Sequence, residues 1–312
     1  MTYLVLAGGL SHERDVSLRS GRRVADALRA RGASVDVRDA DAGLLAALTG
    51  YDAAFIALHG GAGEDGALRE VLDLMGVPYA GSAPSACRLA WDKPTAKTVL
   101  ATAGVPTPPS VTLPHAAFRE LGAVAVLDRI VARLGLPLMV KPAKGGSALG
   151  TAVVRSAADL PAAMVACFSY GDAALVESFV TGTELAVSVL DTGAGPVALP
   201  PVEIVALSGV FDYAARYTAG ATEYFAPARL GAPELAAASA AAVAAHTALG
   251  LRDLSRADMI VDAGGAVHVL EVNVSPGMTE TSMLPMAVAA AGLDTGELLL
   301  DLLARATARG SG

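Results

Sequence analysis

The stretch ADMIVDAGGAVHVLEVN, residues 257–273, decides the fold of the second half of the chain, because two strand-like runs flank a glycine pair. Strand side chains alternate between the faces of a sheet, so Arg256 and Asp258 share one face of the first run. Glu271 and Asn273 likewise share one face of the second run. If the turn comprises the four residues AGGA, Asp258 lies opposite Glu271 and Arg256 lies opposite the amide.

This group of two carboxylates, an amide and a cation is costly unless something neutralises it. Unpaired carboxylates on apolar strands repel each other and raise each other's pKa. Oxygen ligands of this kind select magnesium or manganese, which keep open positions for water and substrate phosphates. The alternative is a solvent-facing strand side with an Arg–carboxylate pair, and the spacing alone does not separate the two. The next segment, NVSPGMTETS at 273–282, is a glycine and proline turn that can present backbone N–H groups, which favours a charge-stabilising site.

A second glycine loop, KPAKGGSALG at 141–150, lies between two predicted strands. Its glycines let the backbone approach phosphate oxygens, and Lys141 and Lys144 supply positive charge. The G-K-[ST] ending of a P-loop is absent. The sequence therefore leaves open phosphate binding by another architecture or a flexible hairpin turn.

A G-x-G-x-x-G sequence occurs at Gly61, Gly63 and Gly66, between a predicted strand and a predicted helix. Glu64 and Asp65 would place two negative charges beside a dinucleotide pyrophosphate, which argues against a nicotinamide-dependent oxidoreductase. The same carboxylates are better suited to attract a substrate cation or to cap the helix.

The order of predicted elements indicates an α/β chain, and 312 residues exceed one ordinary core. The first unit has strands at 3–9 and 52–58 and helices at 16–31 and 67–76, which is typical of a parallel α/β domain. A helix after Lys93 leads to a proline-rich connector at 104–110. The mixed second unit has strands around the glycine loop, a helix at 157–168 and a strand at 173–179. Strands within 183–205, a long loop at 208–227, a helix at 232–250, the hairpin and a closing Leu- and Ala-rich helical segment follow.

Composition argues against several classes of protein. A net charge of −8 disfavours nucleic acid binding, which needs a basic face. Apolar residues make up 53% of the chain, but the most apolar stretch, 234–251, carries Glu234 and His246, so we expect no membrane span. The start, MTYLVLAGG, lacks the basic region of a signal peptide, which predicts a cytoplasmic protein. Cys87 and Cys167 have no paired spacing and are expected to be small core residues.

Taken together, the motifs resemble the D-alanine–D-alanine ligases of the ATP-grasp superfamily over nearly the whole chain. The matching segments are GGLSHERDVSLRSG (8–21), HGGAGEDG (59–66), VPYAGS with DK (77–93), VKPAKGGSALG (140–150), VESFVTGTEL (176–185), FDYAARY through YFAPA (211–228), SRADM (255–259) and LEVNVSPGMTETSMLP (270–285). The resemblance implies an ATP-grasp fold of three domains, with ATP between the last two. These are an N-terminal α/β substrate domain (1–92), a small central α+β subdomain (93–177) and a C-terminal α+β catalytic subdomain (178–312).

The resemblance also implies site residues. Those expected around ATP are Lys93, Lys141, Glu177, Phe179, Val180 and Glu184, with the lysines on the phosphates and Glu184 on the ribose. Those expected to bind two magnesium or manganese ions are Asp258, Glu271 and Asn273, which agrees with the hairpin argument.

Further roles implied by the resemblance concern the two amino acids. Glu13 would hold the ammonium of the first D-alanine, in a hydrogen-bonded set with Ser147 and Tyr217, and His59 would lie near this substrate. Arg256 and the Gly277 backbone N–H would stabilise an oxyanion. Ser282 and the Met283 backbone would receive the carboxylate of the second substrate.

The implied reaction forms D-alanyl-D-alanine for peptidoglycan precursor synthesis through a D-alanyl phosphate, and segment 208–227 would act as a lid. The chain departs from the family at Arg216, where a lysine is usual, and at Ala148, where a second serine is common. Tyr217 is retained, which favours an amine as second nucleophile. The alternatives are a ligase for D-serine, D-lactate or a specialised-metabolite amine, or a nucleotide-binding module without catalysis. The resemblance also implies a homodimer.

Overall fold

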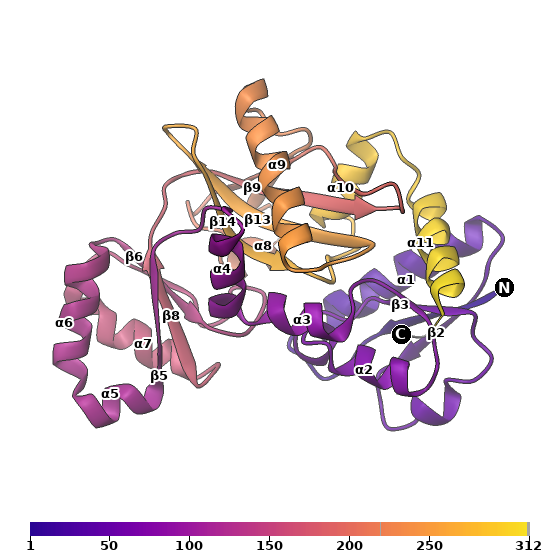
Figure 1. Cartoon of the computed structure of the whole chain (residues 1–312), viewed down its shortest axis with the longest axis horizontal. Helices are drawn as coiled ribbons and strands as arrows, with labels where there is room; N and C mark the ends of the chain where they lie inside the picture. Colours follow the sequence, from indigo (N-terminus) through magenta and orange to yellow (C-terminus); the bar gives the residue numbers. More distant parts are fainter. Residues whose placement is uncertain (219, 311–312) are drawn as a thin grey trace.

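The computed structural model describes residues 1–218 and 220–310, without the side chain of Tyr217, and arranges them in three lobes, each built on a sheet (Figure 1). The first sheet is parallel, in the order β2-β1-β3-β4. Its strands are β1 (Thr2–Ala7), β2 (Ser34–Asp39), β3 (Ala53–Ile56) and β4 (Tyr79–Ala80). Helices α1 (Arg14–Ala30) and α11 (Thr295–Arg309) pack on one face, and α2 (Ala67–Leu74) packs on the other. The predicted parallel α/β unit is confirmed.

The way α1 packs on β1 brings two loops together. A Cβ atom on Gly21 of α1 would lie 2.4 Å from the Cβ of Ala7, so glycine permits a close approach of helix and strand. Ser17 Oγ donates to the carbonyl of Ala57 at 2.8 Å and accepts from the backbone N–H of Gly8 at 2.8 Å. The loops that follow β1 and β3 therefore meet at the carboxyl edge of the sheet, where parallel α/β folds place ligands.

The second sheet is antiparallel, in the order β5-β8-β6-β7. Its strands are β5 (Ser110–Pro114), β6 (Leu138–Pro142), β7 (Ala152–Val154) and β8 (Ala173–Ser178). Its helices are α5 (His115–Leu121), α6 (Ala123–Leu134) and α7 (Leu160–Phe168), and a single-turn 3-10 helix at Ala157–Asp159 precedes α7. The glycine loop joins β6 to β7, as predicted, at the end of this lobe that faces the rest of the molecule.

The third sheet is the largest, with the order β12-β11-β9-β13-β14 and β10 paired with β9. Its strands are β9 (Gly182–Asp191), β10 (Pro196–Ala198), β11 (Val202–Ala206), β12 (Thr222–Phe225), β13 (Leu254–Asp262) and β14 (Val267–Asn273). Helix α9 (Ala232–Ala248) covers one face, where Ala238, Ala242 and Ala245 recur at helical spacing and are buried. Helix α10 (Met283–Ala290) packs against β9 and β11.

The β13–β14 hairpin confirms the predicted pairing but not the predicted turn. Asp258 pairs with Glu271, and Arg256 pairs with Asn273. At the turn, however, Val261 pairs with Val267, so the connection is one residue longer than the predicted AGGA. A register shift between Asp258 and Met259 restores the predicted pairing nearer the site.

Segment 208–227, predicted as a loop, carries two short elements. Helix α8 (Tyr213–Tyr217) begins after Asp212, whose side chain accepts from the backbone N–H of Ala215 at 2.9 Å. Strand β12 then pairs with β11 and extends the third sheet. The prediction of a loop was therefore wrong for these residues, because a short capped helix and an edge strand leave little periodicity in the sequence.

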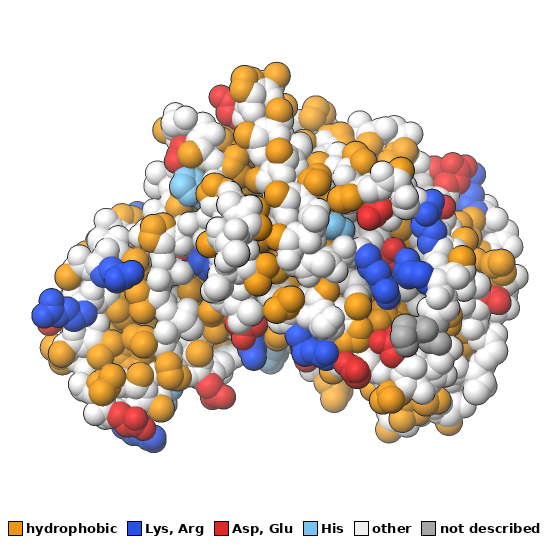
Figure 2. Space-filling model, in the orientation of Figure 1, with side chains coloured by type: hydrophobic (Ala, Val, Ile, Leu, Met, Phe, Trp, Pro, Cys, Tyr) orange, Lys and Arg blue, Asp and Glu red, His pale blue; other side chains and the backbone are white. Residues whose placement is uncertain are grey.

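Helices α3 (Pro84–Trp91) and α4 (Lys93–Thr102) lead from the first lobe towards the second and are separated at Asp92, whose side chain caps α4 by accepting from Thr95 N–H. The domain boundaries at 92/93 and 177/178 stay predictions. Cys87 and Cys167 are free and buried, which confirms their expected place in the core. On the face shown in Figure 2, Lys and Arg side chains lie in small groups with Asp and Glu side chains beside them.

No single helix among the described residues is both long and apolar enough to cross a membrane. Helices α10 and α11 reach that length and composition only as a pair, which is bent by 107° at its break.

Candidate active site

Two adjoining cavities contain the predicted site residues. The first cavity is lined by Glu13, His59, Ser147, Arg216, Arg256, Glu271, Asn273, Gly277, Ser282 and Met283. The second cavity is lined by Lys93, Lys141, Glu177, Phe179, Val180, Glu184, Arg216, Asp258 and Glu271. Four side chains line both cavities and mark their junction, those of Lys93, Phe211, Arg216 and Glu271. The structure therefore brings together every predicted site residue except Tyr217, whose side chain lies outside the described part.

Glu177 holds two lysines at the inner wall of the second cavity. Its carboxylate lies 2.9 Å from Lys97 Nζ and 2.5 Å from Lys141 Nζ, and all three side chains are buried. Burial works to raise the pKa of Glu177, but the charges of Lys141 and Lys97 outweigh it and hold this pKa below its ordinary value. Lys97 was not among the residues expected from the sequence. Its position one helical turn after Lys93 on α4 was the available signal.

Glu184 on β9 also lines the second cavity. Burial raises its pKa to about 7, despite the lowering effect of Arg216. At neutral pH, a carboxyl group with a pKa near 7 is partly protonated. It can therefore both donate and accept hydrogen bonds, which suits a ligand that carries hydroxyl groups.

The ion pair between Lys93 and Glu271 lies at the junction of the cavities. Lys93 Nζ lies 3.3 Å from Glu271 Oε2 and donates to the carbonyl of Gly145, in the glycine loop, at 2.5 Å. Burial opposes ionisation of Glu271, but the nearby Lys93 and Lys141 charges lower its pKa to about 2. This half-buried carboxylate therefore stays charged at neutral pH.

Asp258 is held by Arg256 rather than left open. Arg256 Nε donates to Asp258 Oδ1 at 2.6 Å, and its Nη2 donates to Oδ2 at 2.8 Å. Asp258 also raises the pKa of Arg256, although burial opposes the rise. Asn273 Oδ1 accepts from the backbone N–H of Ser275 at 2.8 Å.

The donor set of this hairpin fits a hard divalent cation. Asp258 and Glu271 are directly paired in the ladder, and the amide oxygen of Asn273 follows on the same strand. Within residues 1–218 and 220–310, no three His, Cys, Asp or Glu side chains gather as a metal site. Two carboxylates and an amide oxygen are nevertheless suited to magnesium, which takes few protein ligands and completes its shell with water and phosphates.

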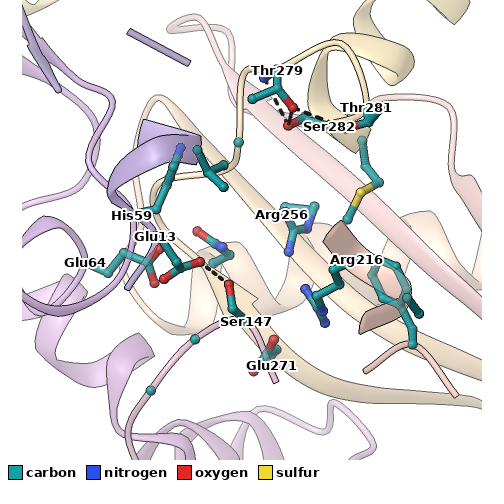
Figure 3. A pocket seen from close by; sticks show the side chains of 18 of the residues that line it. Glu13, His59, Glu64, Ser147, Arg216, Arg256, Glu271, Thr279, Thr281 and Ser282 are labelled. Carbon is teal, nitrogen blue, oxygen red and sulfur yellow. Dashed lines mark hydrogen bonds between the residues drawn. The ribbon is translucent and has the colours of Figure 1, made fainter. Parts of the chain in front are cut away.

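Glu13 lies between two loops in the first cavity and accepts a hydrogen bond from Ser147 Oγ (Figure 3). A Cβ atom on Gly60 would lie 2.4 Å from Glu13 Oε2, and one on Gly146 would lie 3.1 Å away. The two glycines therefore make room for this carboxylate. Ser147 and Ala148 adopt φ values of 51° and 55°, an uncommon conformation outside glycine that places Ser147 towards Glu13.

His59 connects the first lobe to the loop after β14. Its Nδ1 lies 3.0 Å from the carbonyl oxygen of Ser275, which can only accept, so Nδ1 carries a proton. Burial lowers the pKa of His59, which keeps the ring neutral, so Nε2 accepts from Ser20 Oγ at 2.9 Å. The Ser20 oxygen accepts in turn from the backbone N–H of Met278 at 3.1 Å. His59 lines the cavity, but both of its ring nitrogens serve the contact between the lobes.

The loop after β14 folds back on itself at the far end of the first cavity. Ser282 Oγ accepts from the backbone N–H of Thr279 at 3.0 Å and lies 2.9 Å from Thr279 Oγ1. A Cβ atom on Gly277 would lie 2.5 Å from Ser282 Oγ, so only glycine fits beneath this hydroxyl. Ser282 also precedes the first turn of α10, whose N–H groups favour an anion.

The two carboxylates of the G-x-G-x-x-G segment have different surroundings. Asp65 precedes the N-cap Gly66 and accepts from the backbone N–H of Ala67, the first residue of α2, at 2.8 Å, which agrees with the predicted role at the start of the helix. Glu64 instead faces the first cavity, where burial and the charge of Glu13 raise its pKa to about 7. It accepts from the backbone N–H of Gly60 at 3.0 Å.

Arg216 projects into the junction from α8 and lies over an aromatic ring. Its guanidinium carbon is 4.3 Å from the centre of the Phe211 ring, a cation–π distance. Figure 3 shows Arg216 and Arg256 pointing into the cavity from the side opposite Glu13. The cavity therefore combines an acidic wall with a basic one.

Comparison with known proteins gives a consistent family. The family model described as the D-Ala D-Ala ligase C-terminus matches residues 99–304. A D-alanine–D-alanine ligase of Bordetella avium is 43% identical over 98% of this chain and 94% of its own length. One of Pelotomaculum thermopropionicum is 39% identical over 96% of this chain and 94% of its own length.

Solved structures agree in fold. The VanG D-Ala:D-Ser ligase of Enterococcus faecalis has a TM-score of 0.84 at 27% identity, over 98% of this chain and 99% of that chain. The D-alanine–D-alanine ligase of Bacillus anthracis complexed with ATP has a TM-score of 0.82 at 27% identity, over 99% of this chain and 98% of that chain. The expected three-lobed α/β architecture is thus shared with proteins of that type.

Proposed function

The chain belongs to the D-alanine–D-alanine ligase family of the ATP-grasp superfamily, and we propose that it joins two D-alanine molecules to form D-alanyl-D-alanine, ADP and phosphate. The product serves peptidoglycan precursor synthesis. The observation that best supports this proposal is the meeting of the two cavities at Lys93, Arg216 and Glu271. A nucleotide phosphate in one cavity would there reach a carboxylate in the other.

ATP, which the Bacillus anthracis relative binds, would occupy the second cavity. Lys93 and Lys141 would contact its phosphates, and Glu184 would accept hydrogen bonds from the ribose hydroxyls. The base would lie against Glu177, Phe179 and Val180. Removal of Lys141 should therefore weaken nucleotide binding more than it changes binding of the amino acid.

We propose that Asp258, Glu271 and Asn273 hold two magnesium or manganese ions when ATP is bound. Such ions neutralise the negative charge of the phosphates and of the transferring phosphoryl group. The supporting observation is the oxygen-only donor set beside the second cavity. Arg256, which pairs with Asp258 in this structure, would then be able to turn to the substrate.

In the first step, a carboxylate oxygen of one D-alanine attacks the γ-phosphorus, and the bond to ADP breaks. Glu13 would orient this molecule by accepting hydrogen bonds from its ammonium group, with Ser147 and Tyr217 completing the set. Glu13 is well placed because two glycines leave space around its carboxylate.

In the second step, the amine of the other D-alanine attacks the acyl carbon, and phosphate leaves. The Gly277 N–H and Arg256 would stabilise the oxyanion, where one lost donor costs about 3 to 4 kcal/mol. Ser282 and the Met283 N–H, at the start of α10, would receive the carboxylate of this molecule. Residues 208–227 would close over the cavity and exclude water, because acyl phosphates hydrolyse.

A different second substrate is the alternative, because Arg216 lies at the cavity junction and a VanG D-Ala:D-Ser ligase shares the fold. The protein should be given ATP, magnesium and D-alanine together with equal D-serine, D-lactate or another amine, and the products weighed. We expect D-alanyl-D-alanine to dominate. A mixed product in excess would assign the other specificity, and ATP hydrolysis without any condensed product would refute ligation.

We further propose that the reaction takes place in the cytoplasm and that the enzyme is a homodimer. Both follow from membership of the family rather than from a contact in the structure. Sedimentation of the purified protein at several concentrations tests the second point, since a monomer throughout would contradict it.

A further inference from the structure

Arg69 on α2 is a buried cation to which the roles above assign no task. Its side chain is 1% exposed. Nη1 donates to the carbonyl of Gly63 at 2.6 Å, and Nη2 donates to Ser275 Oγ at 2.9 Å. Ser275 Oγ in turn donates to the same Gly63 carbonyl at 3.3 Å. These three groups close a triangle between the loop before α2 and the loop after β14.

Stability alone does not explain an arginine at this position. Arg69 lies on the same buried side of α2 as Leu68 and Leu72, where an apolar side chain would avoid the desolvation of a guanidinium. Its Nε has no hydrogen-bond partner among the described residues. Among the described residues, the hydrogen bonds of this buried guanidinium therefore go to the two loops alone.

The loop that Arg69 holds belongs to the third lobe but is fixed to the first. The Ser275 carbonyl accepts from His59 Nδ1, and the Met278 N–H donates to Ser20 Oγ. Arg69 adds the contact to the Ser275 side chain. Between and just beyond these contacts lie Gly277 and Ser282, which carry the groups proposed for the second chemical step.

We propose that Arg69 is a positioning residue for that second step. Acting through Ser275, it sets the position of the Gly277 N–H and of Ser282, which receive the oxyanion and the second carboxylate. The inference rests on the proposed function. The groups proposed for the first step, such as Lys93 and Lys141, lie on other elements and do not contact Arg69 in the described structure. The two steps should therefore respond differently to its loss.

A single-turnover quench experiment with the full-length protein, ATP, magnesium and saturating D-alanine separates the steps. In Arg69→Met, ADP formation should stay within about twofold of wild type, while dipeptide formation falls about 10- to 100-fold through misplacement of the loop. Arg69→Lys keeps the positive charge and one donor group. Its rate of dipeptide formation should therefore lie between those of wild type and Arg69→Met. An equal loss in both steps, or no loss in either, would overturn the inference, because a general folding defect does not select one step.

Ser275→Ala is the second variant, because it leaves the arginine in place and retains the backbone contacts of the loop. It should slow dipeptide formation in the same selective way, and the Arg69→Met/Ser275→Ala double variant should lose little more than either single variant. If the rate losses of the two single variants multiplied in the double variant, Arg69 would not act through Ser275. If Arg69→Met fails to fold, Ser275→Ala carries the test alone, and an equal loss in both steps or no loss in that variant would overturn the inference.

Arg88→Met is the matched control, since Arg88 is an exposed arginine that pairs with Glu70 of α2 at 2.8 Å. Both steps should be unchanged in it. If the wild-type protein forms no dipeptide from D-alanine, the proposed function fails. If the wild-type protein forms it and Arg69→Met does so equally fast, only the role of Arg69 is refuted.

Discussion

Arg256 and Asp258, two residues apart on β13, form a two-point hydrogen-bonded ion pair with distances of 2.6 and 2.8 Å. Both side chains are buried, so the pair is shielded from solvent. The proposed metal ligand Asp258 is therefore neutralised by the residue proposed for oxyanion stabilisation. A divalent cation and Arg256 must compete for the same carboxylate, and this competition has measurable consequences.

Arg256→Met should affect metal binding and turnover in opposite directions. Removal of the competing guanidinium frees Asp258, so Mn²⁺ should bind more tightly in the presence of a non-hydrolysable ATP analogue, as measured by electron paramagnetic resonance titration. Turnover should fall about 10²- to 10³-fold, because a transition-state donor is lost. Arg305→Met, which removes an exposed arginine paired with Asp301, serves as control. Weaker Mn²⁺ binding in Arg256→Met would show that the arginine organises the site rather than competes.

The hairpin that carries this pair was predictable from the sequence. Strand alternation and the glycine turn gave the opposition of Asp258 and Glu271, which the structure confirms. Two deviations from the predicted hairpin cancel each other. The turn is one residue longer than predicted, and a register shift between Asp258 and Met259 restores the predicted pairing. A bulge depends on local backbone geometry, and the sequence pattern of this hairpin does not signal it.

The partners of Lys97 and Arg69 were not predictable, because these contacts join distant elements of the chain. Lys97 and Glu177 are 80 residues apart, and Arg69 and Ser275 are 206 apart. Nothing local in α4 or α2 indicates which buried carboxylate or hydroxyl the cation will meet. The motifs located the cavities because each motif is contiguous. The supporting contacts arise only when the lobes pack together.

Glu177→Gln should destabilise the free protein strongly. The change leaves Lys97 and Lys141 buried without their shared carboxylate, and removal of one partner from a buried ion pair typically costs about 3 to 5 kcal/mol. Urea unfolding without nucleotide measures the loss. Asp301→Asn, at an exposed pair, should leave the unfolding free energy nearly unchanged. Equal stabilities of Glu177→Gln and wild type would mean that the lysines have other partners.

Glu64→Gln should change how stability depends on pH. The pKa of Glu64 rises from 4.5 to about 7 on folding, mainly through burial, so the folded state keeps a proton that the unfolded chain releases. Wild type therefore loses stability as pH rises from about 4.5 to 7, by about 3 kcal/mol for a fully buried group, and the glutamine variant lacks this loss. Chemical unfolding at pH 4.5 and pH 8 measures this difference. Relative to wild type, the free energy of unfolding of Glu64→Gln should be higher at pH 8 than at pH 4.5.

The exposed Glu70 provides the control for that measurement, since its side chain is 54% accessible. Glu70→Gln should track wild type at both pH values. A Glu64→Gln variant that also tracks wild type would contradict the buried, proton-retaining state of Glu64.

Arg216 and Phe211 should be energetically coupled in the segment proposed to close over the site. The guanidinium carbon lies 4.3 Å from the ring centre, and such contacts contribute about 1 kcal/mol. In a double-mutant cycle of Arg216→Lys and Phe211→Leu, we expect each single change to raise the KM for ATP. Expressed as free energies, the effect of the double variant on the KM for ATP should be smaller than the sum of the two single effects. Full additivity would mean that the stacked contact does not hold Arg216 at the cavity junction.

In the proposed reaction, a carboxylate oxygen of D-alanine takes up the γ-phosphoryl group before the peptide bond forms. D-alanine labelled with ¹⁸O in its carboxylate tests it directly, in a reaction with ATP and magnesium followed by mass analysis of the phosphate. We expect one ¹⁸O atom in each phosphate released and an equal amount of D-alanyl-D-alanine. Unlabelled phosphate, or phosphate released without dipeptide, would contradict it.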